Sequence, residues 1–331
     1  MEPARYADRV SDKVNWVVAG IGDIARKRVI PAIMAEPRST LYGLVTRDAA
    51  KAQAWPGTRA SATIEEAVAD PAVDAVYIAL PVALHAPAAI AALRAGKHVL
   101  CEKPMAIEVA QGERMIAQAR ASGRMLGVSY YRRLYPKLIR ARQLIAEGAI
   151  GQPVLAEANC HGWPELAGRE WLADPALAGG GPLYDIGSHR IDALQFLFGR
   201  FERACGLLSN TVRGMAVEDA ATVAMQFPAG VHGVVDVRWN SRIDRDQFCI
   251  VGSEGEIGLD PLNGPELRVV GCGGSRVEML PPHANFHYPA IENFVDAVLT
   301  GDAARLACPG EEALWTDRVI EQVVRSQAGH N

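Results

Sequence analysis

The fold of the N-terminal half is decided by one stretch, Asn15-Trp16-Val17-Val18-Ala19-Gly20-Ile21-Gly22-Asp23-Ile24-Ala25. A short apolar strand runs into a G-x-G-x-x-A turn, and a helix is predicted from Ala25 to Met34. Gly20 permits a tight turn, Gly22 lets the backbone approach a pyrophosphate, and the small Ala25 lets helix and strand pack closely. The free N–H groups at the start of the helix favour phosphate oxygens. A tight turn without a ligand is the alternative interpretation.

Strands and helices alternate after this turn. Strands are predicted at residues 41–45, 74–80, 98–101 and 125–129, and helices at residues 63–70, 83–95 and 107–122. This alternation predicts a parallel, doubly wound sheet. Ligands of such sheets bind at the carboxyl ends of the strands. We therefore expect one rim to carry Gly20, Gly22, Thr46, Pro81, Glu102 and Lys103.

The end of the second strand bears on the choice of cofactor. A dinucleotide fold that prefers NAD usually has an acid here for the ribose 2′-hydroxyl, whereas this chain has Thr46 and Arg47. A hydroxyl and a guanidinium suit a 2′-phosphate, which predicts NADP. NAD stays possible because Asp48 would be the acid if the strand ended two residues later. A solvated loop charge is the alternative for Arg47.

Lys103 lies at the end of another predicted strand, between Glu102 and Pro104. The following proline restricts its backbone. Such a lysine can donate to a substrate hydroxyl or a cofactor, or carry a proton if desolvation lowers its pKa. The alternative is an exposed lysine that is paired with Glu102.

A second chemical stretch is Gly179-Gly180-Gly181-Pro182-Leu183-Tyr184-Asp185-Ile186-Gly187-Ser188-His189-Arg190-Ile191-Asp192. Its glycines and proline predict a loop, and apolar residues at helical spacing follow. If the helix reaches back to Asp185, that residue and His189 are i,i+4 neighbours and Asp192 follows one turn later. Two acids and an imidazole there form a plausible general acid/base site. The alternative is a helix start whose acids favour the dipole and whose histidine only packs.

Three segments together resemble the Gfo/Idh/MocA oxidoreductases, the family of glucose–fructose oxidoreductase and inositol dehydrogenase; they are residues 19–25, 92–104 and 179–192. The resemblance implies an N-terminal Rossmann domain and a C-terminal α/β domain with a large open sheet. It also implies NAD(P)-dependent hydride transfer at a carbon bearing a hydroxyl or carbonyl, often of a sugar, cyclitol or related polyol. By position, the implied catalytic group is Lys103, Asp185 and His189.

The resemblance also places the loop Leu80-Pro81 and His85 against the cofactor. The family usually has Thr-Pro-Asn there, so Leu80 and Val82 remove two polar side chains but not the backbone contacts. Leu172 stands where many members have arginine, which indicates a less polar or less anionic substrate, or another residue that closes the pocket. The expected cofactor-binding residues are Gly20, Ile21, Gly22, Asp23, Ile24, Thr46, Arg47, Leu80, Pro81, His85, Glu102 and Lys103.

The second half of the sequence predicts a different kind of sheet. We expect a dinucleotide domain at residues 1–129 and a substrate-binding and oligomerisation domain at residues 130–331. Glycine-containing turns between strands favour a mainly antiparallel sheet, and helices are predicted at residues 288–299 and 311–325. One sheet face would remain to be covered, so we expect a homodimer or homotetramer. The predicted strands are residues 153–160, 203–210, 220–227, 231–239, 248–251, 257–259, 267–270 and 277–280.

Composition narrows the remaining classes. The 331 residues carry a net charge of −4, which does not favour nucleic acid as a partner. No apolar run is long enough to span a membrane, and the polar residues 1–13 do not resemble a secretory signal. The six cysteines show no C-x-x-C and the histidines no ligand spacing, so we expect reduced thiols, a cytoplasmic location and no metal site.

Two rival functions remain open on the same fold. One is a redox-silent NAD(P)-binding regulator, and the other is a glycosidase that oxidises and re-reduces its sugar with bound NAD. Within the dehydrogenase hypothesis, the substrate, the direction and the choice between Lys103 and His189 as proton acceptor stay open.

Overall fold

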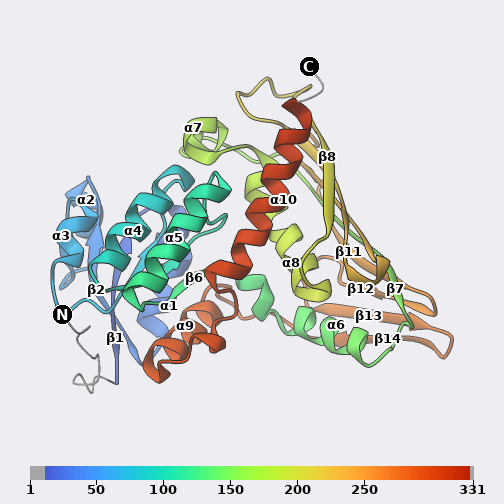
Figure 1. Cartoon of the computed structure of the whole chain (residues 1–331), viewed down its shortest axis with the longest axis horizontal. Coiled ribbons are helices and arrows are strands. Elements are labelled where there is room, and N and C mark those ends of the chain that lie inside the picture. The colour runs from blue at the N-terminus through green and yellow to red at the C-terminus, as the bar shows by residue number, and fades with distance from the viewer. Residues whose placement is uncertain (1–11, 329–331) are drawn as a thin grey trace.

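The computed structural model describes residues 12–328, and the first of its two sheets has six parallel strands (Figure 1). The strand order, β3-β2-β1-β4-β5-β6, is doubly wound about β1 and β4. The predicted α/β sheet is confirmed; residues 1–11 of the predicted leader lie outside the described part. The elements are β1 (Val14–Ala19), β2 (Ser39–Val45), β3 (Arg59–Ser61), β4 (Ala75–Ile78), β5 (His98–Cys101) and β6 (Leu126–Val128), with α1 (Ile30–Ala35), α2 (Ala49–Ala52), α3 (Ile64–Val68), α4 (His85–Arg94) and α5 (Val109–Ser122).

Side chains of β1 show why this sheet forms. Trp16 and Val18 lie in the apolar core on one face, and Val17 and Ala19 lie in the core on the other. A parallel sheet is covered on both faces, so its central strand needs a nearly continuous apolar run. The run from Val14 to Ala19 meets that need and places its carboxyl end, Gly20, at the rim.

Local differences from the predicted elements have simple causes. The short α2 and β3 were missed, because three or four residues are too few to show a periodic pattern. The predicted α-helix from Ala25 is wrong in its first turn, which is a π-helical segment, Ala25–Val29, before α1 begins. Single π-turns occur frequently at functional sites.

The second sheet has eight strands in the order β14-β13-β12-β11-β7-β10-β9-β8. All neighbours are antiparallel except β7 and β10, which confirms the predicted mainly antiparallel sheet. Helices α6 (Pro136–Ala146), α8 (Ser188–Phe198) and α10 (Gly310–Ala328) lie on one face of it (Figure 1). The strands are β7 (Pro153–His161), β8 (Arg203–Ser209), β9 (Ala220–Gln226), β10 (His232–Arg238), β11 (Arg245–Gly252), β12 (Gly255–Gly258), β13 (Glu266–Gly271) and β14 (Gly274–Met279).

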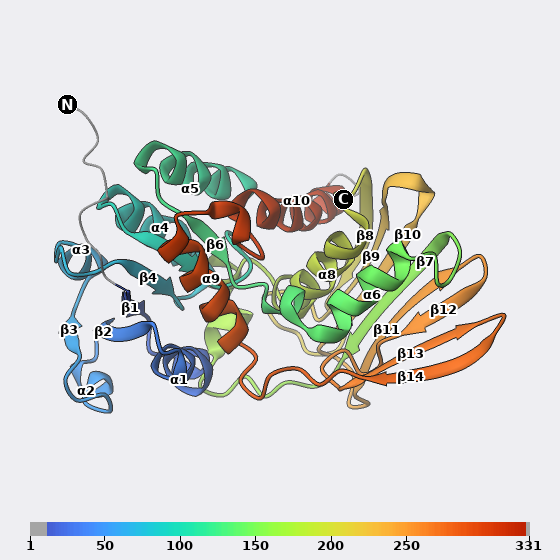
Figure 2. The same ribbon diagram turned by 90° about the horizontal axis from the view of Figure 1, so that it is seen from below.

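Helix α9 (Tyr288–Thr300) comes late in the chain but packs on the first sheet, beside α1 (Figure 2). Its Phe294 ring lies 5.3 Å from the ring of Trp16 in β1. After α9, the carbonyl of Cys308 accepts a hydrogen bond from the N–H of Val128 in β6. The division after residue 129 stays a prediction, and these contacts join α9 to the core of the first sheet.

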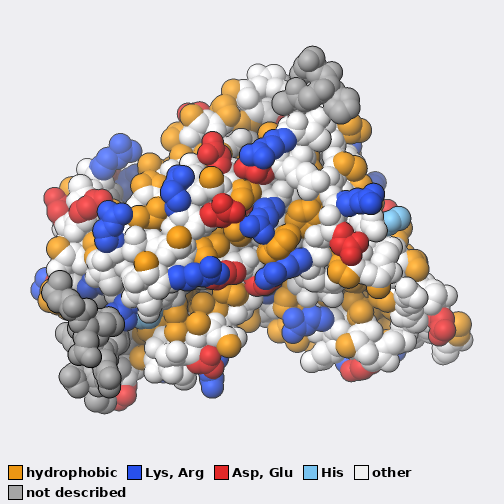
Figure 3. Space-filling model, viewed as in Figure 1, with side chains coloured by type: hydrophobic (Ala, Val, Ile, Leu, Met, Phe, Trp, Pro, Cys, Tyr) orange, Lys and Arg blue, Asp and Glu red, His pale blue; other side chains and the backbone are white. Residues whose placement is uncertain are grey.

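The outer face of the second sheet carries both apolar and polar side chains. Leu207, Val277 and Met279 are exposed there, on the side opposite the helices. On the surface shown in Figure 3, acidic and basic side chains are interspersed. Within residues 12–328, no helix combines the length and the apolar character that crossing a bilayer requires.

Candidate active site

The turn after β1 has the geometry that a bound pyrophosphate needs. Gly20 has a φ of +93°, and a Cβ on it would lie 2.6 Å from the carbonyl oxygen of Ala79, so only glycine fits. A Cβ on Gly22 would meet no protein atom within 4 Å. The space beside Gly22 is therefore open at the start of a helix, where backbone N–H groups attract phosphate.

The next residues of this turn differ in exposure. Ile21 is buried in the core, whereas Asp23 and Ile24 are exposed beside Gly22. An acid beside a pyrophosphate would repel it, but the Asp23 carboxylate pairs with Arg26 at 2.7 Å and with Lys27 at 3.0 Å. These partners offset the carboxylate charge, so Asp23 is compatible with an anionic ligand here.

At the end of β2, the two candidate residues for the ribose have different surroundings. The Asp48 carboxylate accepts the Ala50 N–H at 3.1 Å and caps α2. Thr46 exchanges hydrogen bonds with the Asp48 backbone. Arg47 is exposed and makes no hydrogen bond or ion pair with the described residues. The guanidinium is thus available, and the acid is already engaged.

The His85 ring contacts the backbone of the loop after β4. One ring nitrogen, Nε2, lies 2.9 Å from the Leu80 carbonyl, and Nδ1 lies 3.0 Å from the Pro104 carbonyl. Burial lowers the pKa of His85, so the neutral ring has one proton to donate. It can therefore donate to only one of the two carbonyls, and His85 lies between the loops after β4 and β5, where Leu80 and Pro81 are half-buried. A direct cofactor contact by His85 stays a prediction.

Lys103 reaches from the first sheet to the second domain. Its ammonium donates to the Asp185 carbonyl at 2.7 Å and to the Asp185 carboxylate at 2.8 Å. Only 13% of the Lys103 side chain is exposed. The alternative of an exposed lysine paired with Glu102 is therefore wrong. Instead, Glu102 accepts the Tyr77 hydroxyl at 2.6 Å and lies 3.1 Å from His287.

The glycine-rich stretch places Asp185 against this lysine, and His189 follows about one helical turn later. A π-helical segment, Leu183–Gly187, continues directly into α8, so helical geometry does reach back to Asp185. The carboxylate of Glu218 accepts the N–H groups of Gly181 at 2.9 Å and Leu183 at 3.0 Å, which caps the helix start. Sequence reasoning missed Glu218, because no local pattern links it to a helix that begins more than thirty residues earlier.

The charges at the site favour a carboxylate, an ammonium and a neutral imidazole. Burial raises the pKa of Asp185, but the Lys103 ammonium outweighs it and leaves this pKa below its ordinary value. Burial, together with the positive charges of Arg132 and Lys103, holds the pKa of His189 well below its ordinary value. The buried His189 Nδ1 has no hydrogen-bond partner among the described residues. A neutral base thus lies near a cation.

Asp192 and Arg132 both make contacts with other side chains of the protein. The second acid, Asp192, is buried and receives three hydrogen bonds from the Arg133 guanidinium, the shortest at 2.7 Å. Arg132 is also buried and donates to Asn263 at 3.1 Å. Asp192 is therefore engaged by Arg133 and is not part of the group formed by Lys103, Asp185 and His189.

Two rings near His189 were not identified from the sequence. The centroid of the Tyr131 ring lies 5.0 Å from that of His189 and 4.7 Å from that of His287. Tyr131 precedes α6 and His287 precedes α9, so the fold alone brings them together. Among the described residues, no three His, Cys, Asp or Glu side chains are grouped to hold a metal ion.

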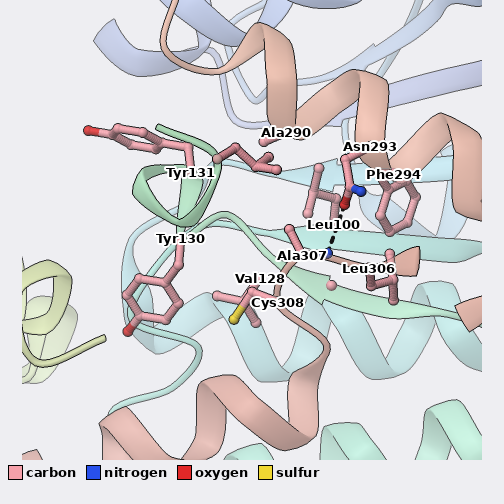
Figure 4. A pocket seen from close by; sticks show the side chains of 12 residues that line it. Leu100, Val128, Tyr130, Tyr131, Ala290, Asn293, Phe294, Leu306, Ala307 and Cys308 are labelled. Carbon is pink, nitrogen blue, oxygen red and sulfur yellow. Dashed lines mark hydrogen bonds between the residues drawn. The ribbon is translucent and has the colours of Figure 1, made fainter. Parts of the chain in front are cut away.

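A small pocket lies behind this site, between β6 and α9 (Figure 4). Its volume is about 20 Å³, which is room for about one water molecule. The Tyr131 side chain borders the pocket and points away from it, and Asn293 bonds to the Ala307 N–H inside it (Figure 4). The pocket is therefore too small for a substrate.

A glycine turn at the switch point of a parallel sheet, facing a Lys–Asp–His group from a second sheet domain, defines a dinucleotide-dependent oxidoreductase. Residues 14–130 match the family model "Oxidoreductase family, NAD-binding Rossmann fold", and residues 138–258 match "GFO/IDH/MocA C-terminal domain". The chain belongs to the GFO/IDH/MocA family. The predicted family and the NAD(P) class of cofactor are both confirmed.

Relatives extend the similarity over nearly the whole chain. A 1,5-anhydro-D-fructose reductase of Ensifer adhaerens is 31% identical over 325 residues, covering 95% of this chain and 96% of the relative. A dTDP-3,4-didehydro-2,6-dideoxy-alpha-D-glucose 3-reductase of Streptomyces violaceoruber is 34% identical over 299 residues, covering 85% and 84%. The aldose-aldose oxidoreductase of Caulobacter crescentus, complexed with glycerol, superposes with a TM-score of 0.87 at 27% identity, covering 96% and 98%.

Proposed function

We propose that this protein transfers a hydride between NADP(H) and the hydroxyl or carbonyl carbon of a sugar, cyclitol or related polyol. The observation that carries the proposal is the contact between Lys103 of the first domain and Asp185 of the second, next to a neutral His189. The names of the relatives, which act on sugars and sugar derivatives, support the substrate class.

The residues divide the chemistry as follows. When bound, the nicotinamide accepts or supplies the hydride. The Lys103 ammonium donates to the substrate oxygen and stabilises negative charge that develops on it. The neutral His189 can accept the hydroxyl proton in the oxidation direction, and the carbonyl oxygen is protonated in the reverse direction. Asp185 orients Lys103 and the substrate hydroxyl.

The preference for NADP over NAD rests on the end of β2. The unpaired guanidinium of Arg47 supports binding of a 2′-phosphate, whereas the Asp48 carboxylate is engaged as the cap of α2. NAD remains the second cofactor to be tested, since neither residue blocks it.

The test is a screen for reduced nicotinamide by its absorbance, with sugars, polyols, cyclitols and diketones and with both NAD and NADP. Net cofactor turnover with a polyol or sugar is the expected result. Glycoside cleavage without net cofactor turnover would instead identify the glycosidase, and tight cofactor binding without any reaction would identify the regulator.

We also propose a homodimer or homotetramer that covers the outer face of the second sheet. The exposed Leu207, Val277 and Met279 support this, together with a polar cluster in which Asp236 accepts from Thr222 and lies 2.6 Å from His161. A monomer mass by light scattering at micromolar concentration would contradict it. The free thiols of all six cysteines support a cytoplasmic location.

A further inference from the structure

We propose that His287 is a positioning residue of the active site, which fixes the backbone of Lys103 through Glu102 and supports Tyr131 beside His189. The proposal rests on the function proposed above. Neither the sequence motifs nor the comparisons assign a role to His287, which belongs to the segment between β14 and α9.

The first contact runs from His287 to the residue before the lysine. The Nε2 atom of His287 lies 3.1 Å from Oε1 of Glu102, and the backbone N–H of Lys103 donates to Oε2 at 3.3 Å. The Tyr77 hydroxyl completes the set at 2.6 Å from Oε1. Burial raises the pKa of Glu102, but the contacts with His287 and Tyr77 and the charge of Lys103 together outweigh it and leave this pKa below its ordinary value.

Both partners of this hydrogen bond are buried, so its loss would cost more free energy than the loss of an exposed one. His287 is 1% exposed and Glu102 is 7% exposed. A carboxylate only accepts, so the Nε2 of His287 must carry the proton. If that donor were lost, the charge of Glu102 would be buried with one fewer partner, and the strand end that carries Lys103 would have to move to satisfy it.

The second contact runs from His287 towards the catalytic histidine. The His287 ring lies 4.7 Å from Tyr131, whose ring lies 5.0 Å from His189. The neighbouring Phe286 stacks on Tyr131 at an interplanar angle of 12°. The segment before α9 therefore touches both parts of the catalytic group, the lysine through Glu102 and the imidazole through Tyr131.

The same segment is tied to the cofactor turn. The Asn285 side chain donates to the Arg28 carbonyl at 2.8 Å, and the Arg28 guanidinium lies over the Phe286 ring at 5.1 Å. Arg28 belongs to the π-helical segment after the glycine turn. Residues 285–287 thus contact three parts of the proposed site. These are the helix after the glycine turn, Glu102 beside Lys103, and the Tyr131 ring beside His189.

The test compares two substitutions of His287 that separate its role as a hydrogen-bond donor from its role as an aromatic ring. His287→Phe keeps an aromatic ring against Tyr131 and removes the hydrogen bond, whereas His287→Gln keeps a donor for Glu102. The matched control is His232→Phe, because His232 is exposed at the start of β10 and lies outside the site.

The primary measurement is the acylation rate of Lys103 in ligand-free protein, followed by mass spectrometry. We expect His287→Phe to speed this reaction about tenfold or more, as loss of one hydrogen bond to a charged group predicts, and His287→Gln and His232→Phe to stay within about twofold. The acylation rate of the exposed Lys51 serves as the internal standard for the activity of the reagent. The buried Lys137 must stay unlabelled, because its labelling would indicate general unfolding.

The second measurement separates positioning from binding. We expect His287→Phe to lower kcat about tenfold or more while the Kd for NADPH, from its fluorescence, stays unchanged. An unchanged acylation rate in His287→Phe would overturn the proposal, whatever the turnover. Because acylation needs no substrate, the proposal can be judged even if the proposed redox function fails.

A third variant keeps the test decisive if His287→Phe does not fold. Glu102→Gln removes the carboxylate that His287 holds, so we expect Lys103 acylation to rise by a similar factor. Adding His287→Phe to Glu102→Gln should then have no further effect, because the carboxylate that needed the His287 donor is already gone and residues in one hydrogen-bond chain are not additive. A further rise in Lys103 acylation in the double variant would show that His287 acts independently of Glu102 and would overturn the proposal.

Discussion

The ammonium nitrogen of Lys103 lies 2.8 Å from a carboxylate oxygen of Asp185, although 82 residues separate them in the chain. The lysine follows a strand of the parallel sheet, and the aspartate begins a helix that packs on the antiparallel sheet. Since about a third of the Asp185 side chain is exposed, we expect this pair to contribute little to stability. We expect its importance to lie in placing a cation whose charge helps to lower the pKa of His189.

Replacing the lysine tests that placement. We expect Lys103→Ala to lower kcat about 10²- to 10⁴-fold, as loss of an electrostatic and proton-transfer group does. The affinity for NADPH should change little if the glycine turn binds the phosphates, as we propose. Steady-state kinetics and a fluorescence titration measure the two effects, with the exposed Lys51→Ala as control. A fully active Lys103→Ala enzyme would end the assignment.

The two glycines of the turn make a matched pair. Gly22→Ala meets no protein atom, so we expect an unchanged unfolding temperature with weakened NADPH binding, because the new methyl group occupies the space for phosphate. Gly20→Ala meets the Ala79 carbonyl at 2.6 Å and should also destabilise the fold by about 1–3 kcal/mol. Thermal unfolding and cofactor titration of both variants separate the two roles. Normal NADPH affinity in Gly22→Ala would argue against a pyrophosphate at this turn.

Arg47 tests the preference for the phosphorylated cofactor. We expect Arg47→Ala to raise KM for NADPH about tenfold or more, as loss of a charge-assisted hydrogen bond predicts. KM for NADH should stay nearly constant, because that cofactor has no 2′-phosphate. Kinetics with both cofactors measure the ratio. An equal loss with NADH would assign Arg47 a general role instead.

The buried pair of Arg133 and Asp192 should matter for stability rather than chemistry. Both side chains are at most 7% exposed, so Asp192→Ala leaves an uncompensated guanidinium and should cost about 3–5 kcal/mol. The surface pair of Arg120 and Glu311 is the control, because Glu311→Ala should cost less than about 1 kcal/mol. Urea unfolding of both variants gives the comparison. Equal losses would contradict the distinction between buried and exposed pairs.

Acid should destabilise the first domain through His98. Burial, with a smaller effect of the Arg124 charge, lowers the pKa of His98 to about 4 from its usual 6.5. The unfolded chain therefore takes up a proton near pH 6.5 and the folded protein only near pH 4, so stability falls as pH decreases between these values. His98→Asn should reduce this loss in urea unfolding at pH 7.5, 5.5 and 4.5. Parallel pH profiles for the two proteins would contradict it.

Local patterns were enough to predict most of the architecture. The strand predicted at residues 98–101 is β5 as observed, because an apolar run between Gly96 and Pro104 has sharp limits. The resemblance to a family, and not a local pattern, implied that Lys103, Asp185 and His189 form one group, and the structure brings Lys103 and Asp185 together. In contrast, the π-turns at Ala25 and Leu183 could not be predicted, because one extra residue per turn hardly changes an apolar pattern.

The residues that were missed share another property. Tyr131, Glu218 and His287 act through contacts with residues far away in the sequence. A spacing pattern records only neighbours along one element, so these residues carry no local signal. The helix at residues 288–299 was predicted, but a prediction of an amphipathic helix does not tell which sheet the helix covers.

The packing of α9 has a consequence for any attempt to isolate the nucleotide-binding half. A fragment of residues 1–129 would lack Phe294, which packs against Trp16. The apolar side chains of the parallel sheet that α9 covers would then be exposed to water. Such a fragment would be prone to aggregation. A version with residues 285–309 fused behind a flexible linker would restore the packing of α9 on the sheet.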